Sequence, residues 1–492
     1  MVVGGPYEGW VAFRTINGDA QLRPTLSKEI RSPIPCATLD TREAAREVGR
    51  GIGTQHLAAD GSAPKGGGIH MNRSMTRART VSGLAFAVLV VAHGGCTQGA
   101  GDRTIVGAAN PKLADEPVPA DLVTANTRFA FKLYRRILTE DAGKNVFISP
   151  ASVSIALAMT YNGADGTTKE AMARTLELGD MALDDVNQAN LILLSNLAYA
   201  DSKAILAIAN SLWARENMPF YPDFIDRNRK YFGAEVTNLD FDDPNSVNVI
   251  NDWVRRNTNG KIPKIVEDIP PEMILYLINA IYFKGTWNDE FDPKQTRDEQ
   301  FTLLDGTKKT VPMMHQTKSY RYLPGSGFQA ASIPYGDSAR FSMYVFLPDP
   351  GSSLEAFQGN LTAENWETWM ASFGEMEGNL GLPRFEIEYE KKLNDVLKAI
   401  GMDIAFDPGQ ANFGKMLPVS GSANAYIGEV KHKTYVKVNE EGTEAAAVTS
   451  VGIGYTSVPQ RFTMVMDRPF FFVIRDNVSG TILFMGSIVD PA

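Results

Sequence analysis

The sequence predicts a mixed α+β protein, because helix-period and strand-period patterns of apolar residues both occur along it. Apolar residues at positions 122, 125, 129, 133 and 137 follow helical spacing. The run Ile274–Phe283 is almost continuously apolar, as in a strand covered on both faces, and Thr434–Val438 alternates like a half-buried strand. The apolar runs Phe470–Ile474 and Ile482–Ile488 enclose a turn-forming segment and predict a hairpin.

Composition narrows the classes of function. The chain has 492 residues, 44% of them hydrophobic and 21% charged, as in an ordinary globular protein. Its net charge of −9 argues against a general nucleic-acid binder. Only two cysteines (Cys36 and Cys96) and five histidines occur, which leaves little material for a disulfide framework, a metal site or a hydrolase triad. We therefore expect neither an enzyme nor a cofactor.

Capping patterns predict helix ends in the globular part. Ser149 can cap a helix that has Pro150 in its first turn and ends at Asn162. Thr167 and Glu170 have the spacing of a capping box for the next helix. Asn210–Trp213 is expected to begin another strand.

The first hundred residues differ from the rest. Residues 1–70 show no periodicity and are expected to lie outside the mature protein, with Met71 as a candidate start of translation. Residues 71–96 combine arginines, the apolar run Val81–Ala92 and small residues before Cys96, which is typical of a signal peptide. The alternative is a buried helix start. Cleavage could follow the small residues, or Cys96 could be lipidated; both outcomes stay open. Residues 97–117 are expected to form a flexible tether to a domain at 118–492.

The segment after Thr434–Val438 carries the strongest functional signal. Two acids and a glycine break the strand pattern, and small residues follow, in the order Glu440, Glu441, Gly442, Thr443, Glu444, Ala445, Ala446 and Ala447. Residues 443, 445, 447 and 449 would share one face of an extended chain, and all four are small and uncharged. The segment could therefore lie in the open as a loop or enter a sheet without burying a charge. An Ala-rich linker or an edge strand is the alternative.

This segment resembles the hinge of the reactive loop in inhibitory serpins. Further motifs of that family occur in family order from about residue 118 to Ala492, including Phe283–Trp287, Leu382–Phe385 and Arg468–Phe470. The resemblance implies an α+β serpin fold, with a large central, mostly antiparallel sheet, further sheets, surrounding helices and an exposed reactive loop. It also implies a bacterial, secreted or lipid-anchored monomer in the extracellular space or cell envelope.

The resemblance assigns roles to particular residues. Residues 440–447 match the hinge, and Trp287 matches the aromatic residue where the loop first enters the sheet. Ser149 and Ser152 match serines beneath the place where the sheet opens, and Asn279 and His432 match a pair that holds the sheet closed.

Family spacing counted from Gly442 places the reactive bond between Thr456 and Ser457, whereas counting back from Arg468 places it after Val458. We expect cleavage at Thr456–Ser457, with Tyr455 as the first alternative. No Lys or Arg lies between Gly442 and Gln460, which favours elastase-, subtilisin- or chymotrypsin-like targets. The resemblance thus implies a serine protease inhibitor that acts as a suicide substrate. A non-inhibitory binding or carrier protein, or an inhibitor of papain-like cysteine proteases, is the alternative.

Overall fold

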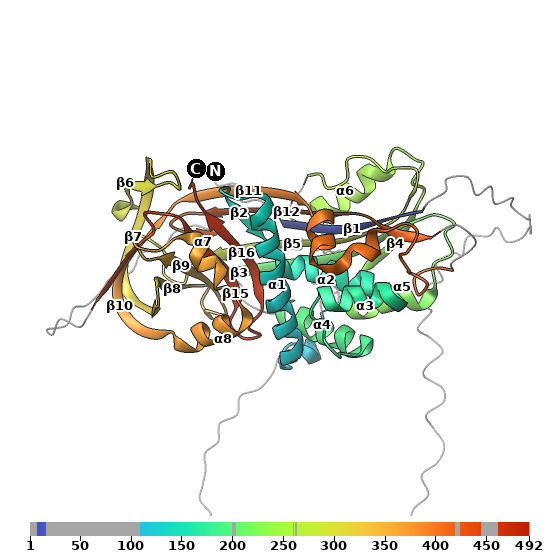
Figure 1. Cartoon of the computed structure of the whole chain (residues 1–492), viewed down its shortest axis with the longest axis horizontal. Helices are drawn as coiled ribbons and strands as arrows, with labels where there is room; N and C mark the ends of the chain where they lie inside the picture. The colour runs from blue at the N-terminus through green and yellow to red at the C-terminus, as the bar shows by residue number, and fades with distance from the viewer. Residues whose placement is uncertain are drawn as a thin grey trace, which may run out of the picture. The chain divides into compact units, whose positions relative to one another are not determined.

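We analysed a computed structural model of the chain (Figure 1). It describes residues 7–15, 109–198, 203–258, 260, 263–418, 424–443 and 461–491. The predicted signal peptide, both cysteines, most of the predicted tether, the hinge from Glu444 onward and the predicted reactive bond lie outside the described residues.

Two mixed sheets and nine α-helices make up the described part of the chain, which confirms the predicted α+β class. The helices are α1 (Ala120–Glu140), α2 (Pro150–Tyr161), α3 (Gly166–Thr175), α4 (Leu183–Ala198), α5 (Pro222–Phe232), α6 (Ser246–Asn257), α7 (Leu354–Gly359), α8 (Ala363–Ser372) and α9 (Asn394–Leu397). No described helix has both the length and the apolar character needed to cross a membrane.

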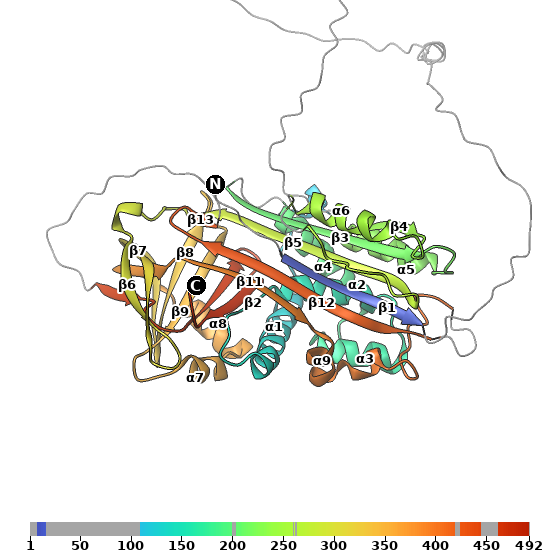
Figure 2. The same ribbon diagram turned by 90° about the horizontal axis from the view of Figure 1, so that it is seen from above.

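The central sheet has the strand order β11, β12, β1, β5, β3, β4 across the described residues, and Figure 2 shows β12, β1, β5 and β3 side by side. Neighbours are antiparallel except for β3 and β4. The strands are β11 (Phe385–Lys392), β12 (Ala425–Val438), β1 (Tyr7–Thr15), β5 (Met273–Thr286), β3 (Ala204–Arg215) and β4 (Glu235–Leu239), and the two-residue β13 (Gly442–Thr443) also pairs with β5.

Helices cover both faces of this sheet, as Figure 1 shows for α2 on one side and α6 on the other. Consequently β5 is buried almost throughout, as its apolar sequence predicts. Leu275 and Leu277 contribute to the main core, whereas Tyr276 and Ile278 pack in a second cluster with Trp253 of α6.

The second sheet runs β14, β10, β7, β8, β9, β15, β16, β2 within the described residues, with β6 paired to β7. Its strands are β14 (Phe462–Val465), β10 (Gly374–Pro383), β7 (Lys308–Gly325), β8 (Phe328–Tyr335), β9 (Phe341–Pro348), β15 (Phe470–Asp476), β16 (Ile482–Ile488), β2 (Val146–Ile148) and β6 (Arg297–Thr302). The pairing of β15 with β16 confirms the predicted hairpin.

The predicted starts of helices and strands agree with the structure only in part. Ser149 caps α2 by accepting a hydrogen bond from the Ser152 amide, as predicted. The predicted capping box was wrong, because α3 begins at Gly166 and Thr167 lies inside the helix. Strand β3 begins at Ala204, six residues before the predicted start at Asn210.

Part of the predicted tether is folded. Pro111–Leu113 form a short 3₁₀ helix, and the Asn196 side chain of α4 donates hydrogen bonds to the carbonyls of Leu113 and Glu116. A buried amide that holds two loop carbonyls fixes the path of the chain, which differs from the flexible segment expected up to residue 117.

Candidate functional site

Strand β1 fills the position between β12 and β5 in the central sheet. It pairs antiparallel with both neighbours, so that Gly9 lies opposite His432 on one side and Asn279 on the other. This strand comes from residues 1–70, where we expected no ordered element. The signal that could have found it is the apolar run from Trp10 to Phe13. The start at Met71 stays a prediction, and such a start would remove this strand.

The side chains at the centre of β1 fit the two faces of the sheet. Val11 and Phe13 are fully buried in the main core, and Phe13 meets Phe413 edge-to-face at 4.9 Å between ring centroids. Ala12 faces the opposite side and joins the cluster under α6. Arg14 then leaves the core and forms an ion pair with Glu272 at 2.9 Å. The strand therefore contributes apolar burial on both faces.

The hinge begins in the sheet rather than outside it. After β12 the chain turns over Asn439–Gly442, where the amide of each end residue donates to the carbonyl of the other, at 3.1 and 3.2 Å. Gly442 and Thr443 then pair with Thr286 and Gly285 of β5. Gly442 has a φ of +130°, and a Cβ there would come within 2.3 Å of the Gly285 carbonyl oxygen. Only glycine fits this turn without displacing β5.

Thr443 of β13 lies buried beside the C-terminal end of β5, with 4% of its surface exposed. Its hydroxyl is 3.2 Å from the Tyr335 hydroxyl, and burial raises the pKa of Tyr335 far above its ordinary value, so the phenol stays protonated. Two neutral hydroxyls in a buried site can share one hydrogen bond. The place of Thr443 therefore suits a small neutral side chain and excludes a charge.

Trp287 borders the same place. Its amide donates to the Glu441 carbonyl at 3.0 Å, and its indole nitrogen donates to the Asn439 carbonyl at 2.9 Å. Its ring stacks on Tyr335 at 4.4 Å between centroids. Trp287 therefore holds the turn at two of its four residues, Glu441 through its backbone and Asn439 through its side chain.

Glu440 anchors the turn from the other side. Its carboxylate is buried and accepts hydrogen bonds from Arg384, at 2.5 Å from Nη2 and 2.8 Å from Nε, and from the Thr296 hydroxyl. Burial alone would raise the pKa of Glu440, but these donors outweigh it and hold the pKa below its ordinary value. The sequence identified Glu440 as part of the hinge but gave no sign of Arg384 as its partner.

The serines beneath the sheet belong to a buried polar cluster at the start of α2. The Ser152 hydroxyl donates to the side-chain oxygen Oδ1 of Asn279 at 2.5 Å, and the side-chain nitrogen Nδ2 of Asn279 donates to Asn210 Oδ1 at 2.7 Å. The Ser149 amide donates to His432 Nε2 at 3.0 Å. The resemblance implied a closed sheet held by Asn279 and His432, but in this structure β1 lies between the strands that carry them.

A gap remains between the two segments that occupy this middle position. Thr443 of β13 pairs with Gly285, and Tyr7 of β1 pairs with Ile281, which leaves residues 282–284 of β5 between them. We call the whole position between β12 and β5 the strand slot. The predicted hinge occupies one end of the slot through Gly442 and Thr443, and β1 occupies it from Ile281 onward.

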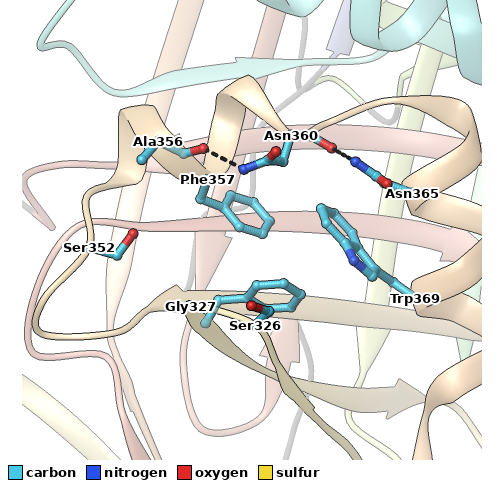
Figure 3. A pocket seen from close by; sticks show the side chains of 9 residues that line it. Ser326, Gly327, Ser352, Ala356, Phe357, Asn360, Asn365 and Trp369 are labelled. Carbon is cyan, nitrogen blue, oxygen red and sulfur yellow. Dashed lines mark hydrogen bonds between the residues drawn. The ribbon is translucent and has the colours of Figure 1, made fainter.

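A separate cavity of about 290 Å³ lies beside α7 and α8 (Figure 3). The rings of Phe328, Phe357 and Trp369 lie 4.9–5.5 Å apart there. Asn360 and Asn365 bond to nearby carbonyls. The volume is at the lower end for a small-molecule site, and the rings already pack on one another. No group of residues suited to a metal ion occurs in the described ranges.

Comparisons with known proteins agree with this architecture. A family model described as Serpin (serine protease inhibitor) matches residues 124–491. Leukocyte elastase inhibitor from Homo sapiens is 33% identical over 382 residues, which cover 75% of this chain and 99% of the relative. Serpin B8 from Homo sapiens is 36% identical over 379 residues and covers 75% and 100%.

Solved structures give the same result. The thermophilic serpin tengpin in the native state has a TM-score of 0.69 and 32% identity, covering 78% of this chain and 97% of its own. Human thyroxine-binding globulin, solved with its ligand bound, has a TM-score of 0.68 and 28% identity, covering 76% and 100%. The match of a family model over most of the chain, together with these relatives, shows that the chain belongs to the serpin family.

Proposed function

We propose that this chain is a suicide-substrate inhibitor of serine proteases. The target's serine Oγ attacks the carbonyl carbon of Thr456, the bond to Ser457 breaks, and Ser457 leaves with a protonated amine. An ester then joins Thr456 to the protease. The chain inhibits if its hinge enters the strand slot before water hydrolyses this ester.

The observation that supports this proposal best is the pairing of Gly442 and Thr443 with β5. The hinge is already aligned with the edge along which insertion must continue. Each further residue would add ladder hydrogen bonds and apolar burial, which supply the driving free energy. No proline occurs between Gly442 and Tyr455, so no ladder donor is missing there.

The target class follows from the loop sequence. Small and aromatic residues surround the proposed bond Thr456–Ser457, with Tyr455 as the alternative, and no basic residue lies near it. One human relative, leukocyte elastase inhibitor, carries a name that agrees with such a target. We infer an elastase-, subtilisin- or chymotrypsin-like target met outside the cell or at the cell envelope, by a monomer that a lipid at Cys96 could attach to a membrane.

A panel of these proteases tests the proposal. With β1 kept out of the space between β12 and β5 by Phe13→Asp, we expect a covalent complex that survives boiling in denaturing electrophoresis, together with a cleaved product that resists heat better than the intact chain. If every protease cuts the loop of this variant and stays active, the chain is a non-inhibitory serpin.

Carrier function is the second candidate, because thyroxine-binding globulin shares the fold. The cavity of Figure 3 gives it little support, since its three aromatic rings are mutually packed. The same protease panel separates an inhibitor from a carrier, because a carrier would only be cleaved. If the target is instead a papain-like cysteine protease, adding such a protease would give a complex linked by a thioester.

A further inference from the structure

We propose that β1 is an intramolecular plug of the strand slot, which keeps the full chain from trapping a protease until the plug is removed. This inference rests on the proposed function, because a plug matters only if the hinge must enter the slot. Its occupant is a segment of this same chain, Tyr7–Thr15.

The register of the two segments shows that they compete. Along β5, Thr443 pairs with Gly285 and Tyr7 pairs with Ile281. Continuing the β13 register by one residue per step places residue 447 opposite Ile281, the position that Tyr7 holds (443 + 4 = 447 and 285 − 4 = 281). Only residues 444–446 could therefore follow Thr443 before the hinge meets β1. Full insertion requires β1 to leave.

The loop and β1 are also similar in the size and polarity of the side chains that would occupy the same positions in the slot. The same count places Val451, Gly452 and Ile453 of the loop where Val11, Ala12 and Phe13 lie in β1 (an offset of 440). Val11 and Phe13 fill the core face, where the loop would offer valine and isoleucine, and Ala12 faces α6, where the loop would offer glycine. Both segments thus present large apolar side chains to one face and a small one to the other.

Two features hold β1 beyond its backbone ladder. Phe13 packs against Phe413, and Arg14 pairs with Glu272. The Arg14 side chain lies over Gly428 of β12, where a Cβ would come within 2.5 Å of Arg14 Cγ. The glycine leaves room for an arginine that the reactive loop lacks, since no basic residue lies between Gly442 and Gln460.

The plug also suggests how it could be released. The chain between Thr15 and Ala109 includes the predicted cleavage zone near Cys96. A cut there would separate β1 from the domain covalently, after which only the slot would retain it. Export would then activate the inhibitor.

Hydrogen exchange on the full chain tests whether the plug forms. Ladder pairing on both sides predicts slow exchange of the amides in residues 7–15 at all protein concentrations, together with a monomeric mass. Exchange as fast as in an unfolded peptide would overturn the proposal. So would protection that appears only with a dimer, because the strand would then come from a second copy. Native protein that never contains residues before Met71 would also overturn it.

Two variants of the full chain test what the plug does. Phe13→Asp places a charge in the core, and Ala12→Pro removes a ladder donor, so each should lower occupancy of the slot by β1 at least about 100-fold. Asp395→Asn is the control, because this side chain is 86% exposed and belongs to α9, outside the strand slot. The probe is a synthetic peptide with the sequence of residues 447–455. Native mass spectrometry should detect it on both plug variants but not on the parent or the control.

The parent, the plug variants and the control are then incubated with the same panel of proteases. Both plug variants should form covalent complex at least about tenfold more than the parent, in line with the freed slot. Adding a peptide with the sequence of residues 7–15 should suppress this gain. If the 447–455 peptide binds parent and variants equally, the plug proposal fails. If it binds only the variants but no protease is trapped, the plug stands and the proposed inhibitory function fails.

Discussion

Arg384 and Glu440 form an ion pair at the start of the predicted hinge, with Arg384 Nη2 2.5 Å from Glu440 Oε1. The glutamate side chain is 7% exposed, and its backbone carbonyl also accepts a hydrogen bond from the Phe291 amide. The ion pair therefore joins the residue between β10 and β11 to the turn Asn439–Gly442, which leads into the proposed reactive loop. The chain thus has a fixed path from the end of β12, through the turn at Asn439–Gly442, to the pairing of Gly442 and Thr443 with β5.

Replacing Arg384 by Met tests this anchor. The carboxylate of Glu440 would stay buried with Thr296 as its remaining side-chain donor, which should cost about 1–3 kcal/mol of unfolding free energy. We expect faster hydrogen exchange in residues 439–443 and a lower urea midpoint. Lys437→Met is the control, since it breaks an ion pair with Glu386, whose side chain is 47% exposed, and should cost less than about 1 kcal/mol. Equal losses in the two variants would show that burial of the Glu440 carboxylate gives its ion pair no special role.

Gly442→Ala tests the turn itself. The new Cβ would clash with the Gly285 carbonyl, and the φ of +130° disfavours any L side chain, a strain of about 1–3 kcal/mol. We expect Gly442 and Thr443 to leave the sheet, which faster hydrogen exchange of β13 and of its partners in β5 would detect. In the Phe13→Asp background the trapped fraction of protease should also fall.

Gly351→Ala is the matched control, because open space surrounds that glycine and its φ is ordinary. Unchanged exchange at β13 in Gly442→Ala would contradict the close approach described for this turn.

The sequence predicted the fold where a pattern reports on local packing. Ile274–Phe283 is apolar because β5 has a covered surface on both sides, and Ser149 caps α2 through its own side chain. The sequence did not predict partners far apart in the chain, such as Arg384 for Glu440, because tertiary pairing leaves no periodic trace. It also missed β1. These nine residues lie in a region without periodicity, and they form a strand because they pair with β12 and β5, which are distant in the sequence.

Asp141 gives the chain a predictable acid sensitivity. Burial alone would raise its pKa, but hydrogen bonds from Lys391, Lys144 and Tyr389 outweigh that effect and lower the pKa of Asp141 from 3.8 to about 2. A lowered folded pKa stabilises the protein above the ordinary pKa, and this contribution disappears as the pH falls from about 4 to about 2. The shift corresponds to about 2 kcal/mol.

Asp141→Asn should therefore lower the free energy of unfolding at pH 7 and make little difference near pH 2. Urea midpoints of parent and variant across this range measure the effect. Asp395→Asn, at a side chain that is 86% exposed, is the control and should leave both values within about 0.5 kcal/mol. A gap between parent and Asp141→Asn that stays constant with pH would contradict the assignment.

Thr443→Arg is the sharpest test of the inhibitory mechanism. Thr443 is 4% exposed and faces the Tyr335 hydroxyl, so an arginine there would have to bury an unpaired cation or keep the hinge out of the slot. Even part of a penalty of several kcal/mol would slow the first step of insertion, and deacylation of the target would then win. We expect the variant to fold and to be cut at the same bond, because position 443 lies outside the cleavage sequence. Mass spectrometry should find a C-terminal fragment that begins at Ser457.

Thr443→Ser is the control for Thr443→Arg, because it keeps the hydroxyl and should still trap the protease. Both variants are best made in the Phe13→Asp background as well as in the parent, so that β1 does not mask the difference. Full covalent trapping by Thr443→Arg in the Phe13→Asp background would show that insertion does not pass through this face of the sheet.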